Sequence, residues 1–236
     1  MTRAAKIALL EDDRDQLEHI ASILRRRQHQ VETFDTAAAL RRKLQTDTFD
    51  LLVTDWNLPD TSGVEVTRWL RTRYGDQIPV MIVTVKSEAE DVIEALGAGA
   101  DDYISKPIHE GVLIARLDAL LRRAYAKDES QRVFTFGDYE FDAAQERATY
   151  RGEDVTLTSK EFNLALTLFT NLSRALSRSF LLETVWGRNP SLPTRTLDAH
   201  VSKVRMKLGL SPANGYLLMP IYSYGYRLEA VEQRAA

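Results

Sequence analysis

The sequence contains no cysteine, which excludes disulfide bonds, thiolate metal ligands and a cysteine nucleophile. Proteins of reducing compartments usually lack disulfides, so this absence favours a cytoplasmic protein. Long hydrophobic runs are also missing: no apolar stretch approaches the ~20 residues that a membrane helix needs. The N-terminus reaches acidic residues after a short apolar run, unlike a signal peptide. We therefore expect a soluble protein with no membrane partner.

The charge of the chain is small but unevenly distributed. Its 236 residues have a formal net charge of −3. Residues 158–227 carry nine Lys and Arg against three Asp and Glu, whereas residues 1–125 carry 17 against 21. One basic segment near the end of a mildly acidic chain indicates a polyanionic partner for that segment, such as nucleic acid.

Residues 1–123 alternate between short apolar runs and segments with helical periodicity. In the first of these segments Leu17, Ile20, Ala21 and Leu24 recur at the i, i+3, i+4, i+7 spacing of one helix face. Five strands alternating with five helices predict an α/β domain with a doubly wound, five-stranded parallel sheet that is covered on both faces. The apolar runs fall at 6–11, 30–34, 51–55, 80–84 and 102–104.

The pattern changes after a short polar segment, residues 124–132, which we interpret as a linker. Short alternating strands, separated by turns at 137–138 and 151–154, predict a small antiparallel sheet. They are followed by three helical segments and by a hairpin rich in Tyr and Gly. Residues 133–236 therefore predict a second, α+β domain. The expected strands are 133–136, 139–141, 148–150 and 155–157, the expected helices are 159–172, 178–186 and 194–208, and the expected hairpin is 216–228.

Polar residues follow the apolar runs of the first domain. In a doubly wound parallel sheet, ligands bind beyond the carboxyl ends of the strands, so these side chains are expected to converge. Packed carboxylates repel one another, and a divalent cation with oxygen ligands, such as Mg²⁺, relieves the repulsion. A lysine and a hydroxyl can hold the oxygens of a phosphoryl group while an aspartate acts as nucleophile. The residues are Glu11, Asp12, Asp13, Asp55, Asn57, Thr84 and Lys106.

Each of these acids, taken alone, is more often an ordinary loop residue. Their joint spacing favours one site, and at this point the resemblance to a family becomes plain. Residues 5–123 resemble a response-regulator receiver domain, which has a flavodoxin-like fold. The stretches that carry the resemblance are LLEDD, LLVTDWNLPDTSG, VMIVT and GADDYISKP.

The resemblance implies a role for each residue of this site. Asp55 is expected to accept a phosphoryl group from a sensor histidine kinase, and Lys106 to contact the phosphoryl oxygens. Thr84 and Tyr103 are expected to form a switch pair, and the Lys106–Pro107 bond to be cis, which proline permits. The ligands implied for Mg²⁺ are Glu11, Asp12, Asp55 and the backbone carbonyl of Asn57.

The sequence departs from the receiver pattern in two places. Val85 stands where a small residue is usual, and we expect it to narrow access to the phosphoryl group. Relatives dimerise through helix four, strand five and helix five by ion pairs, but two valines stand where a basic residue and a glutamate are usual. These valines either supply apolar contacts between subunits or are ordinary packing residues. The candidate dimer face is Val92, Asp102, Val112, Arg116 and Arg123.

Residues 194–208 predict an amphipathic helix with small and basic residues on its outer face. A surface helix with some positive charge is usually only solvated. Here two helices precede it and a hairpin follows, which fits a winged helix-turn-helix whose last helix enters the DNA major groove. The apolar stripe is Leu197, Val201, Val204 and Leu208.

Residues 133–229 resemble the DNA-binding domain of OmpR/PhoB-type response regulators through LTSKEFNLALTLFTNLSRALSRSFLLETVWG, TRTLDAHVSKVRMKLG and YGYRL. Lys203 is the expected base reader, because it can donate to guanine O6 and N7. Ser202 stands where a basic residue is usual, and Tyr222 replaces an arginine of the hairpin. The loop 187–193 is where relatives meet RNA polymerase. The candidate DNA contacts are Arg195, Thr196, His200, Ser202, Lys203, Arg205 and Arg227.

These features together predict a transcription regulator, not an enzyme, which is phosphorylated on Asp55 and binds double-stranded DNA half-sites as a homodimer. One alternative is a Mg²⁺-dependent phosphatase with an aspartyl nucleophile. That class needs a second acid two residues after the nucleophile, where Asn57 cannot titrate. The other alternative is a regulator that binds DNA without phosphorylation, for which Asp55→Ala would leave DNA binding unchanged.

Overall fold

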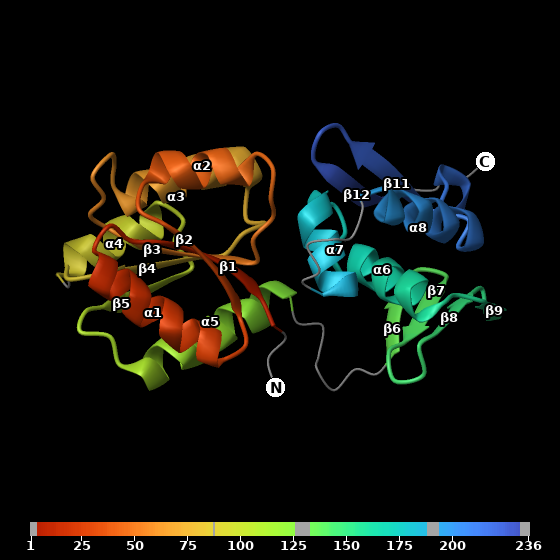
Figure 1. The fold of residues 1–236 in the computed structure, drawn as a ribbon, viewed down its shortest axis with the longest axis horizontal. Coiled ribbons are helices and arrows are strands. Elements are labelled where there is room, and N and C mark those ends of the chain that lie inside the picture. The colour runs from red at the N-terminus through yellow and green to blue at the C-terminus, as the bar shows by residue number, and fades with distance from the viewer. Residues whose placement is uncertain (1–3, 87, 126–132, 188–193, 232–236) are drawn as a thin grey trace. The chain divides into compact units, whose positions relative to one another are not determined.

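The computed structural model describes residues 4–86, 88–125, 133–187 and 194–231. They form two compact units that divide mainly at the segment 126–132, coloured red to green and green to blue in Figure 1. Within the described residues, no helix combines the length and the apolar character that a membrane span requires.

The first unit is a five-stranded parallel sheet with helices on both faces. The strand order is β2-β1-β3-β4-β5, and every neighbouring pair is parallel. This order confirms the doubly wound fold that the alternating pattern predicts. The strands are β1 (Lys6–Leu10), β2 (Gln30–Phe34), β3 (Leu51–Asp55), β4 (Val80–Thr84) and β5 (Asp102–Ser105), and the helices are α1 (Arg14–Arg26), α2 (Ala37–Leu44), α3 (Gly63–Tyr74), α4 (Ala89–Gly97) and α5 (Glu110–Tyr125).

Two hydrophobic clusters lie on opposite faces of this sheet. Ile7 and Leu9 of β1 pack with α1 and α5, whereas Ala8 and Leu10 pack with α2, α3 and α4. Figure 1 shows these two groups of helices on the two sides of the sheet. Successive strand residues point to opposite faces, so a strand covered on both sides buries every residue. This explains why the central strands are continuous apolar runs without polar alternation.

The second unit combines two antiparallel sheets with three helices. One sheet has the order β6-β7-β8-β9 and the other β10-β12-β11. With α8 followed by the β11–β12 hairpin, the arrangement is a winged helix-turn-helix. The strands are β6 (Val133–Phe136), β7 (Tyr139–Asp142), β8 (Arg147–Tyr150), β9 (Glu153–Val155), β10 (Leu176–Ser177), β11 (Tyr216–Ile221) and β12 (Gly225–Ala230), and the helices are α6 (Ser159–Thr170), α7 (Arg178–Trp186), α8 (Thr194–Lys207) and the short 3₁₀ helix η1 (Pro212–Asn214).

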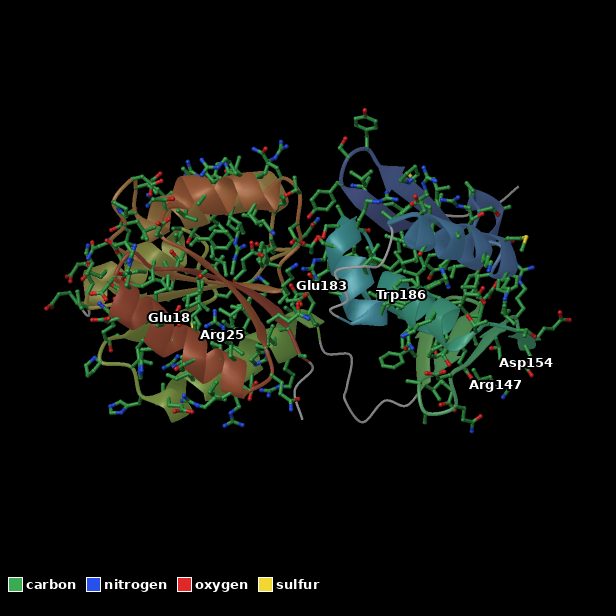
Figure 2. All side chains as sticks on the ribbon, viewed as in Figure 1. Glu18, Arg25, Arg147, Asp154, Glu183 and Trp186 are labelled. Atoms are coloured by element: carbon green, nitrogen blue, oxygen red, sulfur yellow. The ribbon has the colours of Figure 1, made fainter. Side chains whose placement is uncertain are left out.

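The fourth strand of the first antiparallel sheet begins earlier than the sequence predicts. The turn consists of Arg151 and Gly152, both with positive φ (53° and 80°), instead of four residues at 151–154. A two-residue turn with positive φ at both positions matches the twist of a hairpin, so β9 is Glu153–Val155 and not 155–157. An ion pair of 2.5 Å between Arg147 Nε and Asp154 Oδ1 joins β8 to β9 (Figure 2).

Two further boundaries differ from the expected ones. Helix α5 continues through Ala124 and Tyr125, which the polar composition assigns to the linker. The other residues of the expected linker, 126–132, lie outside the described residues. Strand β10 has no counterpart in the sequence pattern, because two residues are too few for a periodicity. It pairs with β12, where a Cβ on Gly225 would lie 2.0 Å from the Leu176 carbonyl oxygen.

Candidate functional site

The carboxyl ends of the parallel strands bring Glu11, Asp55 and Lys106 together. Asp55 is the last residue of β3, and Glu11 and Lys106 directly follow β1 and β5. Lys106 Nζ lies 2.8 Å from Glu11 Oε2 and 3.3 Å from Asp55 Oδ2. The lysine ammonium is therefore shared by two carboxylates, and all three side chains are largely buried. The structure confirms that these strand ends converge on one edge of the sheet.

The three carboxylates fit the oxygen-only ligand set of Mg²⁺. Glu11, Asp12 and Asp55 each offer an oxygen, and these atoms lie within 4.8 Å of one another. Burial raises the pKa of the Glu11 carboxyl above its usual range, the hydrogen bond from Lys106 opposes this, and the nearby Asp55 raises it further. A divalent cation would relieve the repulsion between the acids. Asp12 is exposed, so water molecules can complete the coordination of the ion. Mg²⁺ in proteins commonly retains several water ligands.

Asp13, the third acid after β1, has a structural role instead. Its carboxylate caps α1 by accepting hydrogen bonds from the backbone N–H groups of Asp15 and Gln16 at 3.0 and 3.1 Å. The bond from Gln16 and then that from Asp15 lower the pKa of Asp13. Aspartate is a favourable residue at this position because it satisfies helix donors that lack an intrahelical partner. The sequence groups Asp13 with its neighbours, but only the structure separates its role from theirs.

Gly63 is required by the site, although the sequence marks it only as a loop residue. A Cβ at this position would lie 2.1 Å from the Asp55 carbonyl oxygen, which is far inside van der Waals contact. The Gly63 N–H donates to the Trp56 carbonyl at 2.8 Å, and a bridge pairs Asn57 with Ser62. The β3–α3 loop thus folds back against the end of β3. Asn57, whose carbonyl the resemblance implicates in metal binding, lies within this closed loop.

Thr84 and Tyr103, the predicted switch pair, both contact Lys86. The Thr84 side chain is fully buried, and its Oγ1 accepts from the Lys86 N–H at 3.3 Å. The Tyr103 hydroxyl donates to the Lys86 carbonyl, and its ring packs against the cluster formed with α2, α3 and α4. Lys106 and Pro107 are joined by a cis peptide bond, as the resemblance implies. No sequence motif singles out Lys86.

The residues expected at the dimer face have different surroundings. Asp102 Oδ1 accepts from Arg116 Nη1 of the same chain at 2.7 Å, so this pair is intramolecular here. Val92 is half-buried, whereas Val112 and Arg123 are exposed. The exposed apolar residues of α4 are Ile93 and Leu96. The helical period places these two, rather than Val92, on the outer face.

Helix α8 has the predicted division between a buried and an exposed face. The apolar stripe of Leu197, Val201, Val204 and Leu208 is at most 1% exposed. The exposed side chains of its other face are Arg195, Asp198, Ala199, Ser202, Lys203 and Met206. A cationic and small-residue face of this kind can approach phosphates and base edges. Lys203 and Ser202 are therefore accessible to a partner, and their contact with DNA stays a prediction.

Two other candidate DNA contacts have partners within the unit. The Nδ1–H of His200 donates to the Thr196 carbonyl at 2.8 Å, and the His200 ring packs edge-on against Trp186, labelled in Figure 2. Arg205 Nη2 donates to the Leu218 carbonyl of β11 at 3.0 Å. These contacts position α8 against α7 and the hairpin. Contact of these residues with DNA stays a prediction.

The β11–β12 hairpin carries one fully solvated aromatic residue. Tyr222 is 96% exposed at the turn, beside Ser223 with a φ of +56°. Arg227 Nε of β12 lies 2.6 Å from Glu229 Oε1, so part of its charge is compensated within the strand. The loop expected to meet RNA polymerase, 187–193, lies outside the described residues except for Gly187.

Two family models match the chain in the order of its two units. Residues 7–118 match the response regulator receiver domain. Residues 152–228 match the model described as transcriptional regulatory protein, C terminal. The two matches cover both the acidic site at the sheet edge and the helix with an exposed cationic face.

Curated relatives match over almost the entire length. The DNA-binding response regulator MtrA of Mycolicibacterium smegmatis (strain ATCC 700084 / mc(2)155) is 34% identical, covering 96% of this chain and 97% of that protein. The phosphate regulon transcriptional regulatory protein PhoB of Rhizobium meliloti (strain 1021) is 36% identical, with 95% and 99% covered. The solved structure of DrrB, a Thermotoga maritima OmpR/PhoB homolog, is 30% identical with a TM-score of 0.47, with 96% and 100% covered. On its two family models and the two curated relatives MtrA and PhoB, the chain belongs to the OmpR/PhoB-type response regulators, with a receiver domain followed by a winged-helix DNA-binding domain.

Proposed function

We propose that this response regulator is switched by phosphorylation of Asp55, which a histidine kinase supplies, and that Mg²⁺ is required. The observation that carries the proposal is the convergence of Glu11, Asp12 and Asp55 with the Lys106 ammonium at one edge of the sheet. Such a site combines a nucleophile, a cation and a set of oxygen ligands. Those are the parts that phosphoryl transfer needs.

The chemistry is an in-line transfer between two side chains. An Asp55 carboxylate oxygen forms the new P–O bond while the P–N bond of a phosphohistidine breaks, and the imidazole leaves with the bond's electrons and takes up a proton. Lys106, already 3.3 Å from Asp55, would contact the transferred oxygens. Glu11, Asp12, Asp55 and the Asn57 carbonyl would hold Mg²⁺, and the bound ion would supply charge neutralisation. Burial of Asp55 and Glu11 keeps these interactions strong.

The response to phosphorylation is a population shift toward a state with Thr84 and Tyr103 turned inward. We propose that this state pairs two receivers through α4, β5 and α5, where Ile93, Leu96 and Val112 are exposed. The paired chains then bind two DNA half-sites with their α8 helices. Lys203 reads a base, and Arg195 contacts phosphates.

The decisive experiment treats the full chain with Mg²⁺ and a small phosphoryl donor. We expect a mass increase that maps to Asp55, and dimers in sedimentation velocity. Asp55→Asn, which preserves shape but removes the nucleophile, is the matched control and should show neither change. Modification at another residue, or dimers that form equally in the Asp55→Asn variant, would refute the proposal.

One alternative has an observation in its favour. Tyr103 already donates to the Lys86 carbonyl in the unphosphorylated chain. This arrangement is compatible with a regulator that binds DNA without phosphorylation. DNA binding by Asp55→Ala separates the two functions: the proposed switch predicts weaker binding to paired half-sites, and the alternative predicts no change.

A further inference from the structure

The connection between β4 and α4 is held by side chains from three separate segments. Trp56 directly follows Asp55 in the chain. Lys86 Nζ lies 4.1 Å from the centroid of the Trp56 ring. The same Nζ lies 3.2 Å from Asp91 Oδ1 in the first turn of α4. Lys86 therefore spans from the β3 end to the start of α4, across the edge that carries the phosphorylation site.

The backbone of Lys86 contacts both switch residues. Its N–H donates to Thr84 Oγ1, and its carbonyl accepts from the Tyr103 hydroxyl. The side chain of Lys86 is thus held by Trp56 and Asp91. Its main chain determines where Thr84 and Tyr103 find hydrogen-bond partners. Moving Tyr103 outward would leave the Lys86 carbonyl without this donor.

The contact with Trp56 is the stronger of the two side-chain anchors. An ammonium within about 6 Å of an aromatic centroid is attracted by the ring quadrupole, and Trp is the best partner. Trp56 is only 5% exposed, and its reduced contact with water strengthens the attraction. The Asp91 side chain is 20% exposed, more than Trp56, and ion pairs in contact with solvent contribute little.

We propose that Trp56 and Lys86 are positioning residues of the switch, which hold the β4–α4 connection so that Tyr103 is bonded inward before any phosphoryl group arrives. The pair biases a two-state equilibrium that phosphorylation then completes. This inference rests on the proposed function only in taking Thr84 and Tyr103 as the switch. Trp56 and Lys86 then set the balance between the inward and outward positions of Tyr103 before phosphorylation, although neither residue is a predicted contact of the metal or of the phosphoryl group.

The test measures Tyr103 in the full-length, unphosphorylated chain without Mg²⁺ or donor. Fluorotyrosine-labelled protein is observed by ¹⁹F NMR, and Tyr103→Phe assigns the resonance. Lys86→Met keeps the stem but removes the charge, and Trp56→Leu keeps the charge but removes the ring. We expect each to lower the inward-to-outward ratio of Tyr103 about two- to five-fold, the range of a partly exposed cation–π contact.

Additional variants separate the ring contact from other effects. Lys86→Arg retains a cation over the ring and should retain the inward Tyr103. The double variant Trp56→Leu/Lys86→Met should shift the ratio no further than either single variant, because the two residues act as one contact. Arg41→Met is the matched control: it removes a cation 5.1 Å from the Trp69 ring in the same unit and should leave Tyr103 unchanged.

Several results would overturn the inference. An unchanged Tyr103 resonance in both single variants would do so, as would a shift in Lys86→Met with none in Trp56→Leu, which would assign the effect to charge alone. If Trp56→Leu does not fold, Trp56→Phe replaces it and should give a smaller shift. Failure of the proposed function would instead appear as an unmodified Asp55 in the wild-type chain, and the Tyr103 measurement does not depend on that outcome.

Discussion

Val85, at the edge of the sheet, differs in exposure from the residue before it. Val85 is 65% exposed directly after the fully buried Thr84, so its side chain is not held in the core. A β-branched residue has restricted χ1 freedom, and we expect its bulk to restrict the approach of a phosphoryl donor or of water to Asp55. Because Val85 is exposed, this expectation can be tested without loss of a buried packing contact.

Replacement of Val85 by Ala should accelerate both phosphorylation by a small donor and loss of the phosphoryl group. The reason is wider access to Asp55, and because no buried contact is lost, stability should change by less than about 0.5 kcal/mol. Phosphorylation and dephosphorylation rates are measured by mass spectrometry against time. Rates equal to wild type would show that Val85 does not restrict access.

Elements of the winged-helix unit divide the predicted DNA contacts into two kinds. Lys203 of α8 is exposed, whereas Arg205 is half-buried with its guanidinium bonded to the Leu218 carbonyl of β11. On the same helix, one cation is free to face DNA and the other joins the helix to the hairpin. Substitutions at the two positions should therefore affect different measurements.

Lys203→Ala should weaken binding to the specific site by about 1–3 kcal/mol and reduce discrimination at one base pair. Its unfolding transition should match that of the wild type. Arg205→Ala should lower the free energy of unfolding by roughly 1–3 kcal/mol, because the Leu218 carbonyl loses a donor. Affinity titrations at several salt concentrations and denaturant unfolding check both; equal unfolding midpoints for both variants would contradict the division.

His29, immediately before β2, is the residue from which we expect the receiver unit to become sensitive to acid. It is buried, and its Nδ1 accepts from the Ala5 N–H at 3.2 Å, which requires that nitrogen to be unprotonated. Burial lowers the pKa of His29 below its usual value, and Arg27 also lowers it, while Asp118 and Asp50 oppose the shift. The folded chain therefore binds this proton less readily than the unfolded chain.

Stability from His29 should be complete above its unfolded pKa of about 6.5 and should decline as the pH falls from there toward the lower folded pKa. Denaturant unfolding of the receiver unit between pH 7.5 and 5, followed with and without His29→Leu, checks this. The variant should flatten that decline even if it is less stable throughout. His109→Asn is the control, because His109 is exposed; an equal flattening there would contradict the assignment.

At the scale of the whole molecule, phosphorylation and DNA binding are assigned to two units with separate hydrophobic cores. The receiver has its sheet with two flanking clusters, and the winged-helix unit has one cluster of its own. In the proposed function, only pairing of two chains connects Asp55 to DNA affinity. The spacing of the DNA half-sites is therefore a property of the dimer.

Phosphorylated protein should bind paired half-sites about 10 bp apart, one helical turn, more tightly than a single half-site. Insertion of about 5 bp between them should remove that advantage, because the second half-site then faces the opposite side of the duplex. Gel-shift titrations with both probes measure the difference. Equal affinity for the two spacings would indicate that the chains bind independently.

The candidate site was predictable where its chemistry depends on residues at strand ends. Asp55, Glu11, Asp12 and Lys106 each follow an apolar run, and parallel strands place such positions at one edge. Gly63 and Lys86 were not predictable, since each matters through an atom distant in sequence or in another segment. Only the folded chain brings the Asp55 carbonyl against Gly63 and the Trp56 ring beneath Lys86.

The sequence by itself determined the family, the order of the two units, the parallel sheet and the buried stripe of α8. These follow from local periodicity and from motifs contained in short stretches. Tertiary structure decided the two-residue turn at Arg151, the partners of Arg205 and the exposure of Ile93 in place of Val92. The physical reason is that burial and hydrogen-bond partners depend on which elements pack together, and a pattern along one segment does not contain its neighbours.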